Sequence, residues 1–100
     1  MNTAELNQKG LALLRKAEVK EFNELREKNP DWIPNFRRAF LTGKFIAGVN
    51  LRGADLRDAG IENIDFRAAD LRDADFRRAN LWHTDFRGAN IEGAFGLPKF

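Results

Sequence analysis

The chain has 100 residues, of which 43% are hydrophobic and 32% are charged, and its formal net charge is +2. This length and composition predict a single soluble folded domain and exclude an intrinsically disordered chain. Charge so close to balance favours neither a nucleic-acid-binding protein nor an acidic mimic of DNA.

The residue types that are missing restrict the chemistry. The chain has no Cys, no Ser and no Tyr, and His83 is its only histidine. Most nucleophilic and general acid–base schemes need one of these side chains, so we expect no catalytic residue and no cofactor. His83 with Asp85 is too small a ligand set for a metal ion. The sequence has neither a secretory signal nor an apolar run of about 18 residues, so we expect a cytoplasmic protein without a membrane span.

Residues 3–28 are predicted to form one amphipathic helix. Its apolar side chains recur at helical spacing: Leu11, Leu14, Phe22 and Leu25. Asn2 can cap its N-terminus, and Glu5 lies at the spacing of a capping box. Gly10 inside this run costs about 1 kcal/mol relative to Ala, which predicts frayed first turns. Pro30 follows the end of the helix.

Residues 1–35 are predicted to be an N-terminal helix and linker that cap the rest of the molecule. A stack of repeats exposes backbone edges and apolar side chains at each end, and these must be covered. We expect Phe22, Leu25 and Trp32 to close the first end. The alternative is a helix that projects and pairs with another helix.

From residue 36 onward, large apolar residues recur every five positions. The series has no exception: Phe36, Leu41, Ile46, Leu51, Leu56, Ile61, Phe66, Leu71, Phe76, Leu81, Phe86 and Ile91. Most positions two before these residues hold Ala, and most positions just before them hold Asp or Asn. Neither a helix nor a strand places residues five apart on one face. A chain that turns a corner after each short extended step does so, and we expect the twelve large residues to form the core.

The repeats ADLRD, ADFRR, ANLWH and GANIE resemble those of the pentapeptide-repeat proteins, over Phe36 to Phe95. The resemblance implies an all-β solenoid, a right-handed quadrilateral β-helix with four pentapeptides in each square coil. Twelve repeats then make about three coils, in residues 36–95. The match is weakest at the start, because Lys44 replaces the small residue and Phe40 and Phe45 replace Asp or Asn.

Residues 96–100 form a short C-terminal tail. We expect the last coil to be the less protected end of the stack, because few residues follow it. A second copy of the chain would cover it, as in end-to-end dimers of this family, or the tail would lie across it. The candidate interface residues at this end are Phe76, Ile91, Phe95, Leu97 and Phe100.

Two features of the predicted surface are candidates for binding. Stacking the coils brings five arginines to one face: Arg37, Arg38, Arg57, Arg77 and Arg78. This basic face is either a salt-bridged, solvated surface or a site for nucleic acid. Trp82 occupies an outward position without a role in the core, so it is either an interface anchor or packed on Arg87 or on the C-terminal tail.

These observations favour a non-enzymatic scaffold or protein–protein interaction module that forms a homodimer through its C-terminal coil. Its partner protein is not named by the sequence. The alternative is a role with nucleic acid, as a binder through the basic face or as a DNA mimic that inhibits a topoisomerase. The short length and the arginines among the acidic residues disfavour that alternative.

Overall fold

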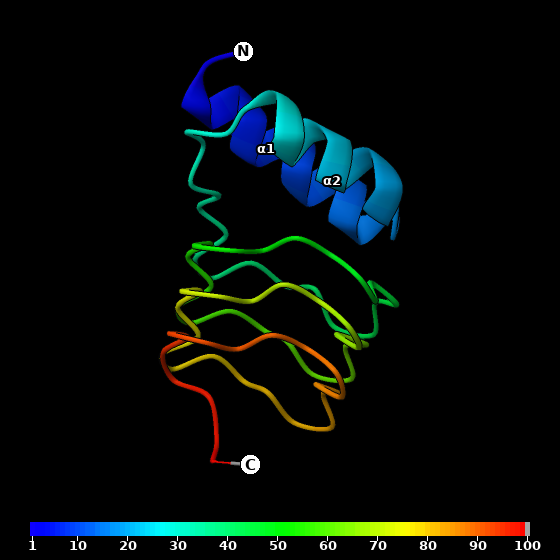
Figure 1. Ribbon diagram of the computed structural model, residues 1–100, viewed down its shortest axis with the longest axis vertical. Coiled ribbons are helices and arrows are strands. Elements are labelled where there is room, and N and C mark those ends of the chain that lie inside the picture. Colours follow the sequence, from blue (N-terminus) through cyan, green and yellow to red (C-terminus); the bar gives the residue numbers. More distant parts are fainter. Residues whose placement is uncertain (100) are drawn as a thin grey trace.

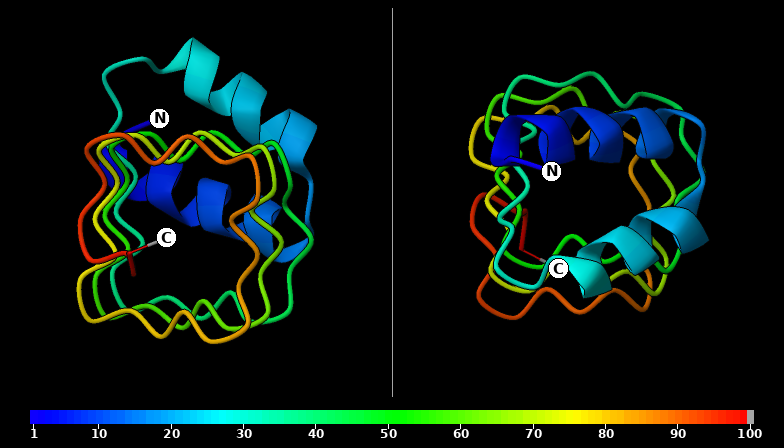
Figure 2. Two further views of the ribbon diagram at one scale, coloured as in Figure 1. Left: turned by 60° about the horizontal axis from the view of Figure 1, so that its bottom comes forward. Right: turned by 90° about the horizontal axis from the view of Figure 1, so that it is seen from above.

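The computed structural model describes residues 1–99 and has two helices, followed by a stack of four-sided coils (Figure 1). Helix α1 spans Thr3–Arg15 and helix α2 spans Val19–Lys28. Both helices lie across the first end of the stack, and the C-terminus lies at the opposite end (Figures 1 and 2). Within residues 1–99 no helix is long and apolar enough to cross a membrane.

The prediction of one helix over residues 3–28 is wrong, because the chain reverses after α1. Ala17 has a φ of 55°, in the left-handed region. Its N–H donates to Leu14 O at 2.9 Å, and Glu18 N–H donates to Leu13 O at 2.9 Å. These two bonds form a Schellman motif, which usually has Gly at the left-handed position. Because this position holds Ala17 and not glycine, the sequence did not mark the end of α1. The helical spacing of apolar residues also continues from α1 into α2.

The N-terminus of α1 follows its prediction, since Asn2 and Glu5 form the capping box. Gly10 does not fray the helix, which continues to Arg15. A Cβ added at Gly10 would lie 2.6 Å from Trp32 Cη2 and 3.2 Å from Phe22 Cε1. Glycine therefore permits close packing of α1 on these rings.

From Asn35 to Phe95 the chain advances by one coil every twenty residues. Parallel bridges join positions twenty apart, from Asn35 with Asp55 to Asp75 with Phe95. Sixty residues thus make three coils, and Figure 2 shows their square outline. The prediction of an all-β solenoid is confirmed only in part, because within residues 1–99 the bridges are isolated and no strand forms.

Each side of the square carries the same five-residue unit, which ends in a tight turn. In the first unit, Ala39 N–H donates to Phe36 O at 3.0 Å, and Arg38, at the third position of this turn, has a φ of 65°. A positive φ at that position is the mark of a type II turn. The bend is centred on the two positions after each large residue, which we call the outward slots. The position before each large residue carries the parallel bridge, and we call it a corner because one five-residue unit meets the next there.

Large apolar side chains fill the interior of the stack. The nine from Phe36 to Phe76 are at most 1% exposed. In the last coil, Leu81, Phe86 and Ile91 are only partly buried against this core. Burial therefore decreases toward the C-terminal end, on the side away from the helices.

Candidate interaction surfaces

The first coil is covered by polar side chains of the helices, which sequence reasoning missed. Asn23 of α2 donates from Nδ2 to Gly48 O at 3.1 Å and accepts the N–H of Asn50 at 2.8 Å. Asn7 of α1 accepts the Trp32 indole N–H at 2.8 Å and the Asn35 backbone N–H at 3.0 Å. In later coils the N–H groups equivalent to those of Asn35 and Asn50 donate to a carbonyl of the preceding coil, and here Asn7 and Asn23 supply the acceptor instead.

Arg26 of α2 makes a third contact of this kind. Its guanidinium donates to Arg52 O and to Trp32 O, and it lies 5.6 Å from the centre of the Trp32 ring. Burial lowers the pKa of Arg26, and Asp70 opposes this shift. Its Nε is buried without a hydrogen-bond partner. The geometry makes Arg26 part of the N-terminal cover and leaves it little freedom to bind a ligand.

The three residues expected to close this end, Phe22, Leu25 and Trp32, are all buried. The rings of Phe22, Trp32 and Phe36 lie with their centroids 6.0 to 6.3 Å apart. This aromatic cluster joins the helices to the first coil, and its tilted ring contacts are favourable.

Corner aspartates hold the arginines that follow them two positions later. In the first such pair, Asp55 accepts the backbone N–H of Arg57 at 3.1 Å, and two guanidinium bonds of 2.9 and 2.8 Å complete the contact. The same arrangement joins Asp65 to Arg67, Asp70 to Arg72, Asp75 to Arg77 and Asp85 to Arg87. Side-chain hydrogen bonds from Arg57 lower the pKa of Asp55, and those from Arg87 lower the pKa of Asp85 to about 2.

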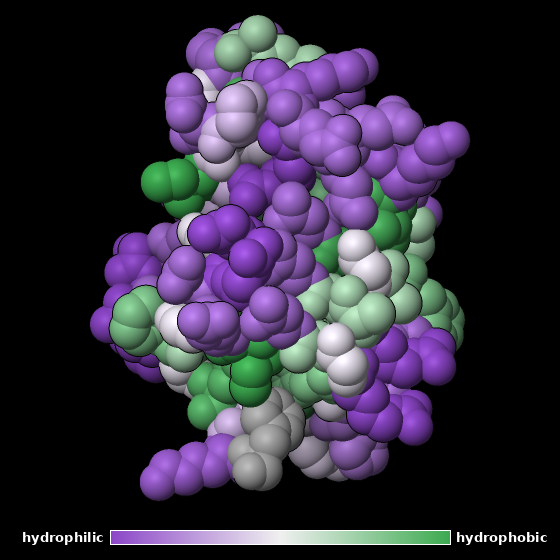
Figure 3. Space-filling view, in the orientation of Figure 1, coloured by the Kyte–Doolittle hydropathy of each residue, from purple (hydrophilic) through white to green (hydrophobic). Residues whose placement is uncertain are grey.

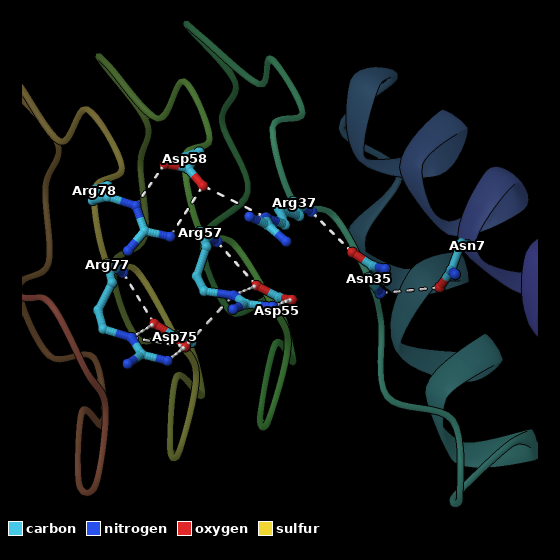
Figure 4. Close-up of polar contacts among 9 residues, drawn as sticks. All are labelled: Asn7, Asn35, Arg37, Asp55, Arg57, Asp58, Asp75, Arg77 and Arg78. Atoms are coloured by element: carbon cyan, nitrogen blue, oxygen red, sulfur yellow. Dashed lines mark hydrogen bonds and ion pairs between the residues drawn. The ribbon is translucent and has the colours of Figure 1, made fainter.

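The basic face is largely salt-bridged (Figure 4). Arg57 and Arg77 are held by their corner aspartates. Asp58 binds Arg78 at 2.9 Å and Arg37 at 3.5 Å, so it joins neighbouring coils. Four of the five arginines are thus engaged by carboxylates, while Arg38 has no ion pair among the described residues.

The C-terminal end has a different character from the covered N-terminal end. Phe76, an expected interface residue, is fully buried and so belongs to the core, because the chain at Phe95 and Gly96 returns beside it. Ile91 and Leu97 are partly buried, and Phe95 is 56% exposed beside Arg77. Phe100 lies outside the described residues.

A hollow of about 480 Å³ opens at this end, lined in part by Ala89 and Ile91. The backbone around it lacks partners that earlier coils have. Ile61 N–H donates to Asn80 O at 2.8 Å and Leu71 N–H to Asn90 O at 2.9 Å. Phe76 N–H still donates to Phe95 O at 2.8 Å, but within residues 1–99 several equivalent N–H groups of the last coil have no acceptor: Arg78, Leu81, His83, Gly88, Ile91 and Gly93. Figure 3 shows apolar residues gathered toward this end on one side of the molecule.

Trp82 is 65% exposed and lies on the side of the stack between corners 40 and 45. The ring of His83 stacks on it, with centroids 3.9 Å apart and planes inclined by 17°. Phe40 and Phe45, which are 74% and 78% exposed, occupy the two corners of the same side in the first coil. The sequence showed Trp82 and the two irregular corners separately, and the twenty-residue coil brings them to one side.

Comparison with known proteins places these repeats in context. A sequence model of pentapeptide repeats matches residues 35–73 and 64–95, with eight copies. One solved structure to which the chain is similar is that of HetL of the cyanobacterium Nostoc sp. strain PCC 7120, a pentapeptide repeat protein involved in the regulation of heterocyst differentiation. It is 26% identical with a TM-score of 0.40, over 61% of this chain and 33% of HetL.

A second solved structure is that of alr5209, a pentapeptide repeat protein from Nostoc PCC 7120. It is 32% identical with a TM-score of 0.30, over 59% of this chain and 57% of alr5209. This chain therefore spans about a third of HetL and little more than half of alr5209. No curated protein sequence matches the chain.

Proposed function

Because this chain belongs to the pentapeptide-repeat family, we propose that it is a non-enzymatic interaction module whose coils form a right-handed quadrilateral β-helix. The module forms a homodimer through its C-terminal coil. A cytoplasmic location is part of this proposal.

The difference between the two ends of the stack carries the proposal. At the N-terminal end, Asn7, Asn23 and Arg26 satisfy backbone groups of the first coil. At the C-terminal end, N–H groups of the last coil lack acceptors within residues 1–99, and Ile91 is only partly buried. An edge with unpaired donors beside apolar side chains is a template for association with another chain. The same edge also presents carbonyls: Ala59 O accepts from Asn80 and Ala69 O from Asn90, whereas Ala79 O and Ala89 O have no donor within residues 1–99. A second copy therefore offers acceptors as well as donors, and a twofold contact between two last coils would cover both edges.

The role with nucleic acid has less support. A phosphate-binding face needs guanidinium groups that are free to replace counterions, and four of the five on the basic face are held by Asp55, Asp58 and Asp75. The same pairing removes the continuous negative charge that a DNA mimic requires. A steep loss of DNA binding with added salt would revive the first role.

Light scattering coupled to size exclusion tests the homodimer. We expect twice the chain mass for the wild type and a folded monomer for Ile91→Arg, which places a charge in the contact. Leu97→Arg, in the tail, provides a second variant if Ile91→Arg does not fold. Ala68→Arg is the matched control, because it adds the same charge on a lateral side at a φ of 58°, close to the 62° of Arg78. A wild-type monomer at all concentrations, or equal loss of the dimer in the control, would contradict the proposal.

A further inference from the structure

One side of the stack differs from the other three in charge. We call it the Trp82 face, and it comprises the outward slots of residues 41–44, 61–64 and 81–84 and the corners that border them. Its outward slots are Thr42, Gly43, Glu62, Asn63, Trp82 and His83, with no arginine. The three remaining sides have five, two and two arginines in their outward slots. The Trp82 face is also the only side whose outward slots carry a net negative charge.

The two exposed phenylalanines of this face lack a hydrogen bond that other corner residues make. Corner residues such as Asn50 accept the backbone N–H two positions later, here Arg52 at 3.1 Å, and a phenylalanine at a corner has no atom for this bond. Phe45 is nevertheless 78% exposed at such a corner. Phe40 lies over Gly60, where an added Cβ would be 2.8 Å from its Cδ1. Exposed rings that give up a local hydrogen bond indicate a binding role.

Glu62 and Trp82 stand in one column of this face, one coil apart. The Thr42 hydroxyl, in the same column, donates to Glu62 Oε2 at 2.6 Å and so orients the carboxylate. Glu62 has no ion pair within the described residues. Its neighbour one coil on is the Trp82 ring, which is supported on one side by His83. Neighbouring coils lie about 4.8 Å apart, so one planar cation can reach both groups.

A hollow of about 500 Å³ lies beside this column. Phe45 lines it together with Asn63, His83 and the carboxylates of Asp65 and Asp85. Arg67 and Arg87 also reach it, each held by its corner aspartate. Lys44 occupies a partly buried inward position and not an outward slot. The exposed Phe45 ring in this hollow can therefore receive an apolar side chain of the same ligand.

We propose that the Trp82 face binds an arginine-containing segment of a partner protein, with a guanidinium between Glu62 and Trp82 and a neighbouring apolar side chain against Phe45. Arginine fits better than lysine, because its planar head stacks on an indole and forms two parallel bonds to a carboxylate. Most carboxylates on the remaining sides already hold an arginine, whereas Glu62, without an ion pair in residues 1–99, is free to accept one, which favours this face. The inference extends the proposed interaction module, but it does not depend on contact through the C-terminal coil.

Nuclear magnetic resonance of the full ¹⁵N-labelled chain tests this inference. The probe is a blocked peptide of alternating arginine and leucine, and the comparison peptides carry citrulline or lysine in place of arginine. The two indole N–H signals provide the readout, because Trp82 is exposed and Trp32 is buried and bonded to Asn7. We expect a saturable shift of the Trp82 signal with the arginine peptide, a weaker response with lysine, and no change of the Trp32 signal.

Variants then locate the contact. Glu62→Gln keeps an acceptor for Thr42 and removes the charge, and Phe45→Asn restores an ordinary corner residue. We expect each to weaken binding about two- to fivefold, the range of an exposed cation–π or surface ion-pair contact. Trp82→Leu, followed through the Glu62 amide, should weaken it by a similar factor. Glu92→Gln removes a charge from another side of the stack and should leave binding unchanged.

Equal shifts with the citrulline peptide, unchanged binding by Glu62→Gln, or shifts centred on another side would overturn the proposal. A Trp82 signal that moves with protein concentration alone would show that a second copy occupies this face, which also overturns it. The Ile91→Arg variant separates the two proposals. If the peptide binds this variant as it binds the wild type, the Trp82 face acts independently of self-association, whichever oligomeric state the wild type has.

Discussion

The side-chain oxygen of Asn23 accepts the backbone N–H of Asn50 at 2.8 Å. In the next coil the equivalent N–H, of Asp70, donates to Val49 O at 2.9 Å. No coil precedes the first one, so the carboxamide of Asn23 supplies the acceptor that a backbone carbonyl supplies in the next coil. Side chains of the helices thus hydrogen-bond the backbone edge of the first coil. Within residues 1–99 no helix covers the edge of the last coil in this way.

Asn23→Ala tests whether the Asn23 side chain stabilises the edge of the first coil. It leaves the Asn50 N–H and the Gly48 carbonyl without their partner, so we expect the free energy of unfolding to fall by about 1–3 kcal/mol. Urea denaturation followed by circular dichroism measures it. Glu24→Ala, at an exposed neighbouring position of α2, should change it by less than about 0.5 kcal/mol. Equal effects of the two changes would refute the assignment.

Gly10→Ala separates helix propensity from packing. Propensity alone predicts a gain of about 1 kcal/mol. The new Cβ, however, would meet Trp32 Cη2 at 2.6 Å, and that ring is held between Phe22 and Phe36. Overpacking costs about 1–3 kcal/mol, so we expect no gain and a net loss of up to about 2 kcal/mol in urea denaturation.

Ala12→Gly, at an exposed position of α1, reports propensity without packing and should lose about 1 kcal/mol. A stabilised Gly10→Ala protein would show that the packing of α1 on Trp32 is wrong.

Ala17→Gly should stabilise the reversal between α1 and α2. Ala17 has a φ of 55°, and a left-handed backbone costs a residue with a Cβ about 1–2 kcal/mol. Glycine removes this strain but makes the unfolded chain more flexible, which takes back about 0.4–1 kcal/mol. The expected net result is a rise of the thermal midpoint by a few degrees in calorimetry. A lower midpoint would indicate that α1 and α2 join as one continuous helix.

The corner aspartates predict a loss of stability in acid. Hydrogen bonds from arginine lower the pKa of Asp55, Asp65, Asp70 and Asp75, and that of Asp85 to about 2. Their contribution is complete above the unfolded pKa of about 3.9 and is lost as pH falls through the folded value. Midpoints of urea denaturation should therefore be flat from pH 7 to 5 and fall from about pH 4 to pH 2.

Asp85→Asn provides the matched variant, because the amide oxygen still accepts the Arg87 N–H while the charge is removed. The difference in midpoint between wild type and Asp85→Asn should disappear as the pH approaches 2. A difference that stays constant over this range would contradict the assigned pKa of Asp85.

Much of the coil stack was predictable because its signal is repeated. Twelve large residues at a spacing of five determine which side chains point inward, and an error at one position does not shift the others. The burial of Phe76 was harder to foresee, since it depends on how residues 95 and 96 return beside the last coil.

The contacts of single residues were not predictable. Ala17 replaces the glycine that would mark a helix end, and Gly10 looked unfavourable because its contact with Trp32 lies 22 positions away in the chain. In the sequence, Asn23 and Arg26 look like ordinary polar residues of an amphipathic helix. Their role depends on the first coil, which lies beneath them only in the folded structure. The Trp82 face could be recognised only once the twenty-residue coil was known, because that coil brings Phe40, Phe45 and Trp82 to one side of the stack.

The most direct test of the open C-terminal edge is amide hydrogen exchange at two protein concentrations. Gly88, Ile91 and Gly93 carry N–H groups without acceptors within residues 1–99, while Ile61 donates to Asn80 and serves as the internal reference. If two last coils meet, exchange at Gly88, Ile91 and Gly93 should slow at least tenfold between micromolar and millimolar protein, with Ile61 unchanged. Equally fast exchange at both concentrations would contradict association through this coil.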